Sequence, residues 1–255
     1  MAIANIRQAV LQQGGLLRSL LIYYGIPGRI GRLQRFYAPF IQPGDLCFDV
    51  GAHVGNRVLA WRRLGARVVA VEPQPHLAQL LQRWYGRDPD VTILSLALGA
   101  RPGSAALYVD HRNPTVGTLS AGWMAAVQQD RSFAGVHWEK TADVPVTTLD
   151  ALIEQYGVPA FCKIDVEGFE LEVLRGLCCA LPVLSFEYIP AAIEVAYGCL
   201  ERLEELSDKQ GRYEFNYFAG ESYRWQSPTW LEGKALAMRL SEQKRSGDVV
   251  ARLKR

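Results

Sequence analysis

Short apolar runs alternate with helical segments from residue 46 onward, and this alternation constrains the fold more than any other feature of the sequence. Leu46–Val50, Arg67–Val71 and Val91–Leu96 have the length and composition of buried strands, whereas Asn56–Leu64 and Pro75–Tyr85 have helical character. Glycine or proline marks the short connections. Because a β-α-β-α-β order places the strands in parallel and the helices on both faces, the sequence predicts a doubly wound α/β sheet.

The alternation resumes after an irregular middle section. We expect a hairpin of Ser104–Asp110 with Val116–Ser120, followed by residues 121–140 as either a binding loop or a surface excursion. The later elements are expected to be strand Val144–Thr147, helix Leu149–Tyr156, strand Ala160–Ile164, helix Phe169–Leu177, strand Val183–Phe186, helix Leu200–Gln210 and a β pair of Tyr213–Phe218 with Tyr223–Gln226.

The two ends of the chain differ from this central part. Residues 3–24 have apolar positions at helical spacing, broken at Gly14–Gly15, which predicts one or two amphipathic helices. We therefore divide the chain into an N-terminal helical extension (1–44), a main α/β domain (45–230) and a basic C-terminal tail (231–255).

The charge balance argues against nucleic acid as a partner. The formal net charge is only +2, and no basic stripe crosses the predicted core. The ends are locally basic, which is typical of solvated tails but also allows weak contact with an acidic membrane surface or an anionic substrate. The apolar segment Leu16–Tyr24 is short and is interrupted by Arg18, so we expect neither a membrane helix nor a signal peptide. The oligomeric state stays open.

The cysteines point to a reducing compartment. There are five, an odd number without the CxxC spacing of zinc or redox sites. Cys47 and Cys162 lie inside apolar runs and are expected in the core. Since no disulfide framework follows from this arrangement, we expect a cytoplasmic protein.

A glycine turn and a distant acid form the first candidate site. The turn after the first strand reads Asp49-Val-Gly51-Ala52-His53-Val-Gly55-Asn56. Ligands of open α/β sheets bind beyond the carboxyl ends of the strands, where glycine lets the backbone approach them. Glu72 ends the second strand, and a carboxylate there can accept hydrogen bonds from both ribose hydroxyls.

The spacing and charge of this turn discriminate between two nucleoside cofactors. Its G-x-x-x-G spacing departs from the G-x-G-x-x-G of dinucleotide sites. Asp49 would repel a pyrophosphate but attract the sulfonium of S-adenosylmethionine. The turn therefore favours S-adenosylmethionine, with a nicotinamide cofactor or a purely structural turn as alternatives.

Acids at the ends of two later strands form the second candidate site. The first run reads Lys163-Ile-Asp165-Val-Glu167-Gly168-Phe-Glu170, and Glu187 ends the next strand. An alcohol must lose its proton to attack a sulfonium methyl, and a carboxylate of raised pKa can accept that proton. Helix capping is the alternative for Asp165 and Glu167. Lys163 is expected to act with these acids or to neutralise one of them, and Glu170 is expected in solvent. The same oxygen atoms could instead hold a divalent metal; since no histidine joins them at a recognisable spacing, a metal is kept as the lesser alternative and no metal ligands are assigned.

With both sites in view, the sequence resembles the FkbM family of S-adenosylmethionine-dependent methyltransferases. Lys163–Glu170 with Val173-Leu-Arg-Gly176 is similar to its hallmark, and Asp49–Gly55 to its first motif. Glu72-Pro73, Ala97-Leu98-Gly99, Thr147–Asp150 and Glu187 follow in the family's order. The resemblance implies a mostly parallel, seven-stranded, Rossmann-like class I methyltransferase sheet and O-methylation of a hydroxyl on a sugar or small metabolite.

By position, the resemblance also assigns roles. Asp49, Gly51 and Gly55 would line the methionine end of the cofactor, Glu72 its ribose, and Ala97 and Leu98 its adenine, while Asp165 and Glu167 would face the methyl group. The full predicted cofactor set adds Ala52, His53, Asn56, Pro73 and Asp165, and the full catalytic set is Asp165, Glu167, Lys163 and Glu187. His53 departs from the asparagine that is usual in the family, and Asn56-Arg57 from small or aromatic residues. A cofactor-binding scaffold without catalysis is a further alternative.

Overall fold

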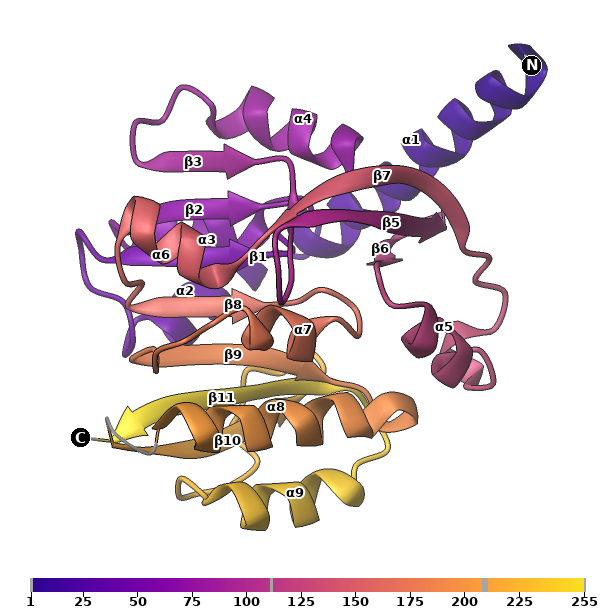
Figure 1. The fold of residues 1–255 in the computed structure, drawn as a ribbon. Helices are drawn as coiled ribbons and strands as arrows, with labels where there is room; N and C mark the ends of the chain where they lie inside the picture. The colour runs from indigo at the N-terminus through magenta and orange to yellow at the C-terminus, as the bar shows by residue number, and fades with distance from the viewer. Residues whose placement is uncertain (1, 111, 208–210, 255) are drawn as a thin grey trace.

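A seven-stranded sheet runs through the centre of the computed structural model, which describes residues 2–110, 112–207 and 211–254 (Figure 1). The strand order is β10-β11-β9-β8-β1-β2-β3. In chain order these strands are β1 (Leu46–Val50), β2 (Arg67–Val71), β3 (Val91–Leu94), β8 (Phe161–Ile164), β9 (Val183–Tyr188), β10 (Arg212–Ala219) and β11 (Gly247–Lys254). β11 runs antiparallel to both β9 and β10. The predicted α/β fold is present, and its sheet is mixed.

Helices cover both faces of this sheet. On one face the apolar core is formed with α6 (Leu149–Tyr156), α7 (Glu170–Arg175), α8 (Ile193–Ser207) and α9 (Gly233–Ser241). On the other it is formed with α2 (Arg29–Tyr37), α3 (Asn56–Arg63) and α4 (Pro75–Tyr85). All five residues of β1 are buried. A strand covered on both faces needs apolar side chains in both directions, which explains why the central strands form continuous apolar runs.

The strand register brings the ends of the four strands that carry or precede the candidate acids to one edge of the sheet. Val50 pairs with Val71 of β2 and with Ile164 of β8, and Ile164 pairs with Phe186 of β9. Since these four strands are parallel, the turns that follow them all leave from the same edge of the sheet.

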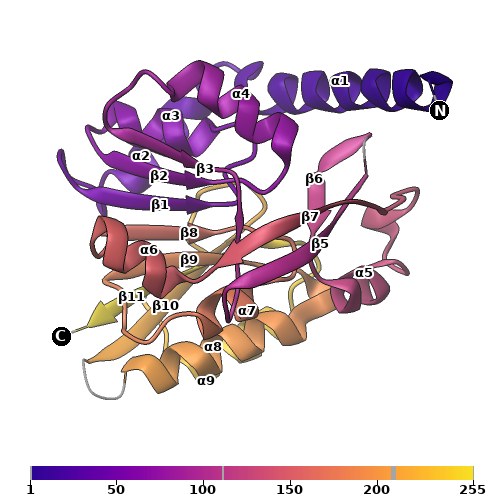
Figure 2. The same cartoon turned by 45° about the horizontal axis from the view of Figure 1, so that its top comes forward.

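A second, four-stranded sheet lies beyond that edge (Figures 1 and 2). It consists of β4 (Ala97–Leu98), β7 (Glu139–Thr147), β5 (Gly103–Asp110) and β6 (Asn113–Thr118), in that order. The predicted hairpin is confirmed, because β5 and β6 pair antiparallel. β7 pairs with both β4 and β5 and includes residues for which the sequence predicted no regular structure. The short helix α5 (Ala121–Val127) follows β6.

The N-terminal segment combines a projecting helix with a core helix. α1 (Ala2–Tyr24) continues through Gly14–Gly15, so of the two predicted alternatives the single helix is present. Its first turns extend away from the body (Figures 1 and 2). α2 is not an extension, because Leu33, Phe36 and Tyr37 are buried in the core beside β1 and β2. Within the described residues, none of the helices combines the length and apolarity needed to cross a membrane.

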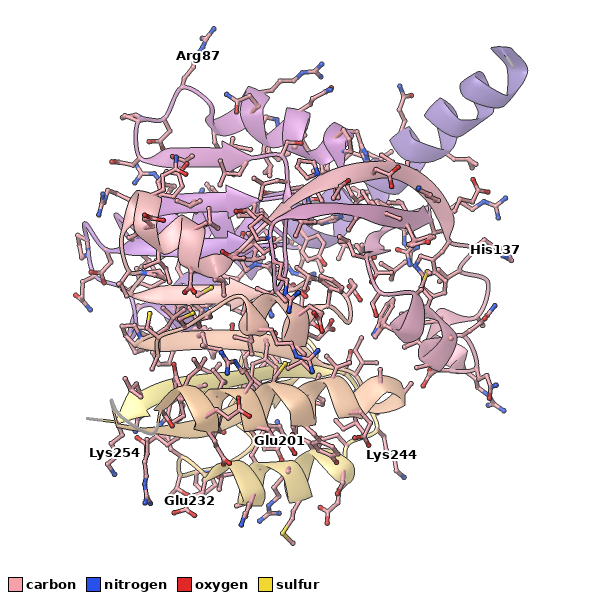
Figure 3. The ribbon with its side chains drawn as sticks, viewed as in Figure 1. Arg87, His137, Glu201, Glu232, Lys244 and Lys254 are labelled. Carbon is pink, nitrogen blue, oxygen red and sulfur yellow. The ribbon has the colours of Figure 1, made fainter. Side chains whose placement is uncertain are left out.

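The C-terminal segment is part of the sheet, so the prediction of a basic tail over 231–255 is wrong for the described residues, which end at Lys254. α9 packs on one face, and β11 lies between β9 and β10. Val249, Val250 and Ala251 are fully buried. This apolar run is short and has basic residues nearby on both sides. The predicted partner of the strand at Tyr213–Phe218 was Tyr223–Gln226, but in the structure β10 pairs with β11. Basic side chains on both sides of this run reach solvent, as Lys244 and Lys254 do (Figure 3).

Candidate active site

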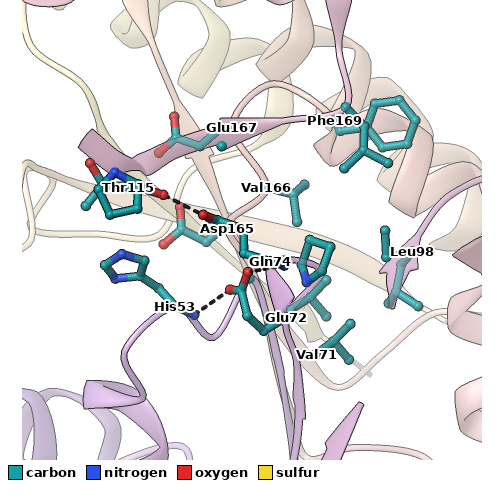
Figure 4. Close-up of a pocket in the computed structure, with 17 residues that line it drawn as sticks. His53, Val71, Glu72, Gln74, Leu98, Thr115, Asp165, Val166, Glu167 and Phe169 are labelled. Atoms are coloured by element: carbon teal, nitrogen blue, oxygen red, sulfur yellow. Dashed lines mark hydrogen bonds between the residues drawn. The ribbon is translucent and has the colours of Figure 1, made fainter. Parts of the chain in front are cut away.

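A crevice opens between the carboxyl edge of the main sheet and β6 (Figure 4). Counted together with its opening to solvent, it encloses about 510 Å³. The residues of both predicted sites that line it are Gly51, His53, Glu72, Pro73, Ala97, Leu98, Asp165 and Glu167. The structure therefore brings the two candidate sites together in one place.

Glu72 is fixed at the centre of this crevice. It is 2% exposed, and its two carboxylate oxygens accept hydrogen bonds of 2.8 Å from the backbone N–H groups of His53 and Gln74. Burial raises the pKa of Glu72 to about 7, although the two N–H donors act in the opposite direction. A carboxylate held from behind in this way keeps further lone pairs for the two hydroxyls of a ribose.

The far side of the crevice is apolar. Leu98, Val166 and Phe169 lie together there, away from His53 and Glu72 (Figure 4). An adenine ring needs a flat apolar slot of this kind beside the ribose acceptor. The crevice thus offers an apolar end for a base and a carboxylate for a ribose in the order that a nucleoside requires.

The glycines of the first turn serve backbone packing rather than a gap for the ligand. Gly51 has φ of +84°, and a Cβ there would lie 1.9 Å from the carbonyl oxygen of Asp165. Gly55 has φ of +74°, and its Cβ would lie 2.7 Å from the Leu81 side chain. The turn after β1 must pass against the end of β8 and against α4, and only glycine allows both approaches.

Arg57 is a site residue that the sequence analysis missed. Its guanidinium donates to Asp49 Oδ1 at 2.7 Å, to Asp165 Oδ2 at 2.9 Å and to the Gly51 carbonyl oxygen at 2.8 Å. Asp49 is fully buried and Arg57 nearly so. The charge of Asp49 is therefore compensated by its ion pair with Arg57. This arrangement does not support the prediction that Asp49 itself attracts a sulfonium. Arg57 was seen only as a departure from the family pattern.

His53 and the end of α1 form one wall of the site. The ring of Tyr23 lies edge-on to His53, with 5.6 Å between centroids, and Ser19 Oγ lies 3.4 Å from His53 Nε2. Burial, with the nearby Arg57, lowers the pKa of His53 to about 3. The imidazole is therefore neutral, and α1 contributes directly to the site through Tyr23 and Ser19.

A polar cavity adjoins the nucleoside crevice. The two share Gly51, His53, Thr115, Asp165 and Glu167 in their walls. The remaining lining residues of the polar cavity are Tyr23, Asn56, Arg57, Glu187, Gly220, Glu221, Tyr223, Ser246, Gly247 and Asp248. Several of these come from the segments after β10 and before β11, so the misassigned C-terminal region supplies much of this wall.

Three carboxylates meet in the polar cavity. Oxygen atoms of Asp165, Glu167 and Glu187 all lie within 4.8 Å of one another. Burial alone would raise the pKa of Asp165, but Lys163 and Arg57 outweigh it and hold that pKa below its ordinary value. Burial and the neighbouring Asp165 raise the pKa of Glu167 well above its ordinary value, and burial and Glu167 do the same for Glu187. The cluster therefore combines one acid of lowered pKa, Asp165, with two acids of raised pKa, Glu167 and Glu187.

Lys163 supports this cluster from behind. It is 2% exposed, forms an ion pair with Asp248 of β11, and lies 4.0 Å from Asp165. Although burial opposes it, the two acids raise the pKa of Lys163, so the ammonium stays charged. Lys163 lines neither cavity. Three other predicted cofactor residues also line neither the nucleoside crevice nor the polar cavity: Asp49, Ala52 and Gly55.

A tight turn presents Asp165 and Glu167. Glu167 and Gly168 both have positive φ, and a Cβ on Gly168 would lie 2.1 Å from the Trp123 ring of α5. Glu170 is 2% exposed and accepts hydrogen bonds from the N–H groups of Val166 and Gly168. The prediction that Glu170 is solvated is therefore wrong, because its carboxylate holds the turn.

The fold and the paired cavities are those of an α/β protein with a ligand crevice at the carboxyl edge of its sheet and acidic side chains beside that crevice. The profile of the methyltransferase FkbM domain matches residues 49–197, which is more than half of the chain. The chain therefore belongs to the FkbM family of methyltransferases, whose cofactor is S-adenosylmethionine. This assignment removes the nicotinamide alternative.

Comparison of whole structures gives more distant similarities. An O-methyltransferase from Bacillus cereus, solved with S-adenosylhomocysteine, is 14% identical with a TM-score of 0.46, over 97% of this chain and 90% of that one. A precorrin-6Y C5,15-methyltransferase from Geobacter metallireducens is 10% identical with a TM-score of 0.44, over 90% of each chain. Comparison with curated protein sequences finds no significant match.

Proposed function

We propose that this methyltransferase acts on a hydroxyl group of a sugar or small metabolite. The observation that carries the proposal is the pair Glu167 and Glu187 beside the nucleoside crevice. Both acids have raised pKa values, and neither has an ion-pair partner among the described residues. A hydroxyl is a poor nucleophile until its proton is taken, and such a pair is suited to take it.

The residues of the crevice fit S-adenosylmethionine. Glu72 would hold the ribose, the apolar side formed by Leu98 and Phe169 would hold the adenine, and the methionine end would lie toward Asn56 and Arg57. When bound, this cofactor supplies an electrophilic methyl group on a sulfonium. The polar cavity next to it is then the place for the acceptor.

The acids divide the work of the reaction. Bound S-adenosylmethionine would supply the methyl group to the acceptor oxygen, and the ionised member of the Glu167–Glu187 pair would accept the hydroxyl proton. Asp165 is a weaker proton acceptor, because Arg57 and Lys163 lower its pKa. We assign Asp165 to orienting the acceptor, and Lys163 to positioning Asp165.

The proposal is tested by binding and transfer together. Calorimetry is expected to show S-adenosylhomocysteine binding, and a labelled methyl donor is expected to label a hydroxyl of a sugar or metabolite in cell extracts. Glu167→Gln and Glu187→Gln are expected to lower turnover by about 10²–10⁴ while keeping S-adenosylhomocysteine affinity. Glu154→Gln, at an exposed position on α6, is the matched control. Full turnover in both site variants, or a product methylated on nitrogen, would overturn the proposal.

A further inference from the structure

A second groove lies on the α2 face of the sheet, near the opposite edge from the nucleoside crevice. Its floor and walls come from α2, from the segment 222–230 and from the ends of β9 and β11. Val183, at the start of β9, and Arg252, near the end of β11, mark its position in the sheet and pair with each other. Of the residues that line this groove, Tyr223 is the one that also lines the site described above.

Four arginines line this groove: Arg32, Arg35, Arg224 and Arg252. The groove has no acidic side chain in its lining as far as the chain is described. Arg252 is held by an ion pair with Glu214 and stacks on Trp230 at 4.0 Å. The side chains of Arg32, Arg35 and Arg224 form no hydrogen bond or ion pair with described residues. Like charges gathered without counter-charges repel one another, and a bound anion would relieve that repulsion.

Aromatic rings form the rest of the groove and are held in place by one another. Trp225 lies 5.0 Å from Phe36 and 5.5 Å from Trp230, measured between ring centroids. Trp225 nevertheless remains 39% exposed. An exposed indole fixed by neighbouring rings is suited to stack against a flat or pyranose ring at little entropic cost. The groove thus joins positive charge to a stacking surface.

Tyr223 links this groove to the acceptor cavity, because it lines both. Along β11, Asp248 belongs to the cavity and Arg252 to the groove, four residues apart on the same face of the strand. At the rise of a strand this separation is about 13 Å. The distance is short enough for one elongated molecule to contact both places by way of Tyr223, since Val250, between Asp248 and Arg252 on that face, is buried.

We propose that the groove binds a phosphate-bearing, ring-containing part of the acceptor, with phosphate on the arginines and a ring against Trp225. The hydroxyl to be methylated would then lie about 13 Å away, beside Glu187. The link to the acceptor rests on the proposed function. The binding of phosphate in the groove does not, so the two can fail separately.

The experiment measures binding of pyrophosphate, uridine diphosphate and uridine by calorimetry at low salt. We expect uridine diphosphate to bind more tightly than pyrophosphate, and uridine not to bind. Replacing Arg35→Gln and Arg224→Gln together is expected to weaken uridine diphosphate binding at least about tenfold. Trp225→Leu is expected to weaken uridine diphosphate binding but not pyrophosphate binding.

The controls separate this groove from the cofactor site. S-adenosylhomocysteine affinity is expected to be unchanged in all these variants. Arg87→Gln, an exposed arginine at the far end of the molecule from Lys254 (Figure 3), is expected to leave binding of uridine diphosphate unchanged. Absence of pyrophosphate and uridine diphosphate binding in the wild-type protein would overturn the proposal. So would sedimentation with phosphatidylglycerol vesicles that depends on Arg35 and Arg224, if uridine diphosphate does not compete.

Discussion

Arg57→Met tests whether the buried guanidinium holds the site together. The substitution keeps a long apolar side chain but leaves Asp49, which is fully buried, without the donor now 2.7 Å from it. Removing one partner of a buried ion pair costs about 3–5 kcal/mol, because the other charge remains in a poorly solvated place. At roughly 2–4 °C per kcal/mol for a chain of this size, the melting temperature should fall by roughly 6–20 °C.

The pH dependence identifies the cause of this loss. Burial already raises the pKa of Asp49, and Arg57 opposes that rise. Without Arg57 the folded-state pKa of Asp49 moves further above its unfolded value, so the native state holds a proton that the unfolded state has released. Stability of the variant then falls as pH rises between those two pKa values, and the deficit should be larger at pH 8 than at pH 5.

Calorimetric melting at pH 5 and pH 8 measures both effects. Arg63→Met on the same helix, at an exposed position, should leave the melting temperature nearly unchanged. Adding Asp49→Asn to Arg57→Met removes the stranded charge and should recover much of the loss. A variant that melts within 2 °C of the wild type at pH 8, or a deficit equal at both pH values, would refute the reasoning.

Two further predictions concern the crevice and its turn. Burial raises the pKa of Glu72 to about 7, and ribose hydroxyls favour its ionised form, so the affinity for S-adenosylhomocysteine should rise from pH 6 to pH 8. Glu72→Gln should bind S-adenosylhomocysteine weakly and without this pH dependence. Calorimetry that shows the same change of affinity with pH in both proteins would contradict the prediction. Gly168→Ala should destabilise the fold by roughly 1–3 kcal/mol, because φ at this position is +86° and the added Cβ would overlap the Trp123 ring. In Gly122→Ala on α5 the added Cβ meets no atom within 4 Å, so this control should keep the stability of the wild type. Equal urea midpoints for the two variants would exclude the proposed contact.

The positions of Glu72, Asp165 and Glu187 follow from local patterns in the sequence. Each comes directly after an apolar run, and parallel strands end at one edge of a sheet, so their convergence needs no knowledge of distant contacts. The turn residues were found for the same reason, although the need for glycine at Gly51 comes from Asp165, 114 positions later, rather than from a ligand.

Contacts between distant segments explain what the sequence did not reveal. Arg57 looks like an ordinary helix residue, and only the fold shows that it reaches both Asp49 and Asp165. Tyr23 belongs to a helix whose docking has no local signal. Asp248 lies in an eight-residue strand whose apolar run, Val249–Ala251, is short and has basic residues nearby on both sides, and this pattern is equally typical of a tail.

The charge pattern of the site also explains why neighbouring acids can have different roles. Arg57 and Lys163 are both buried, and both form ion pairs with aspartates. Arg57 pairs with Asp49 and Asp165, and Lys163 pairs with Asp248 and lies near Asp165. These pairs keep Asp165 ionised, and they leave neither Arg57 nor Lys163 free to pair with the two glutamates. Two carboxyl groups so close together in a poorly solvated cavity cannot easily both be charged, so one retains a proton while the other can accept one. The fixed ion pairs thus create the unpaired glutamates on which the proposed proton transfer depends.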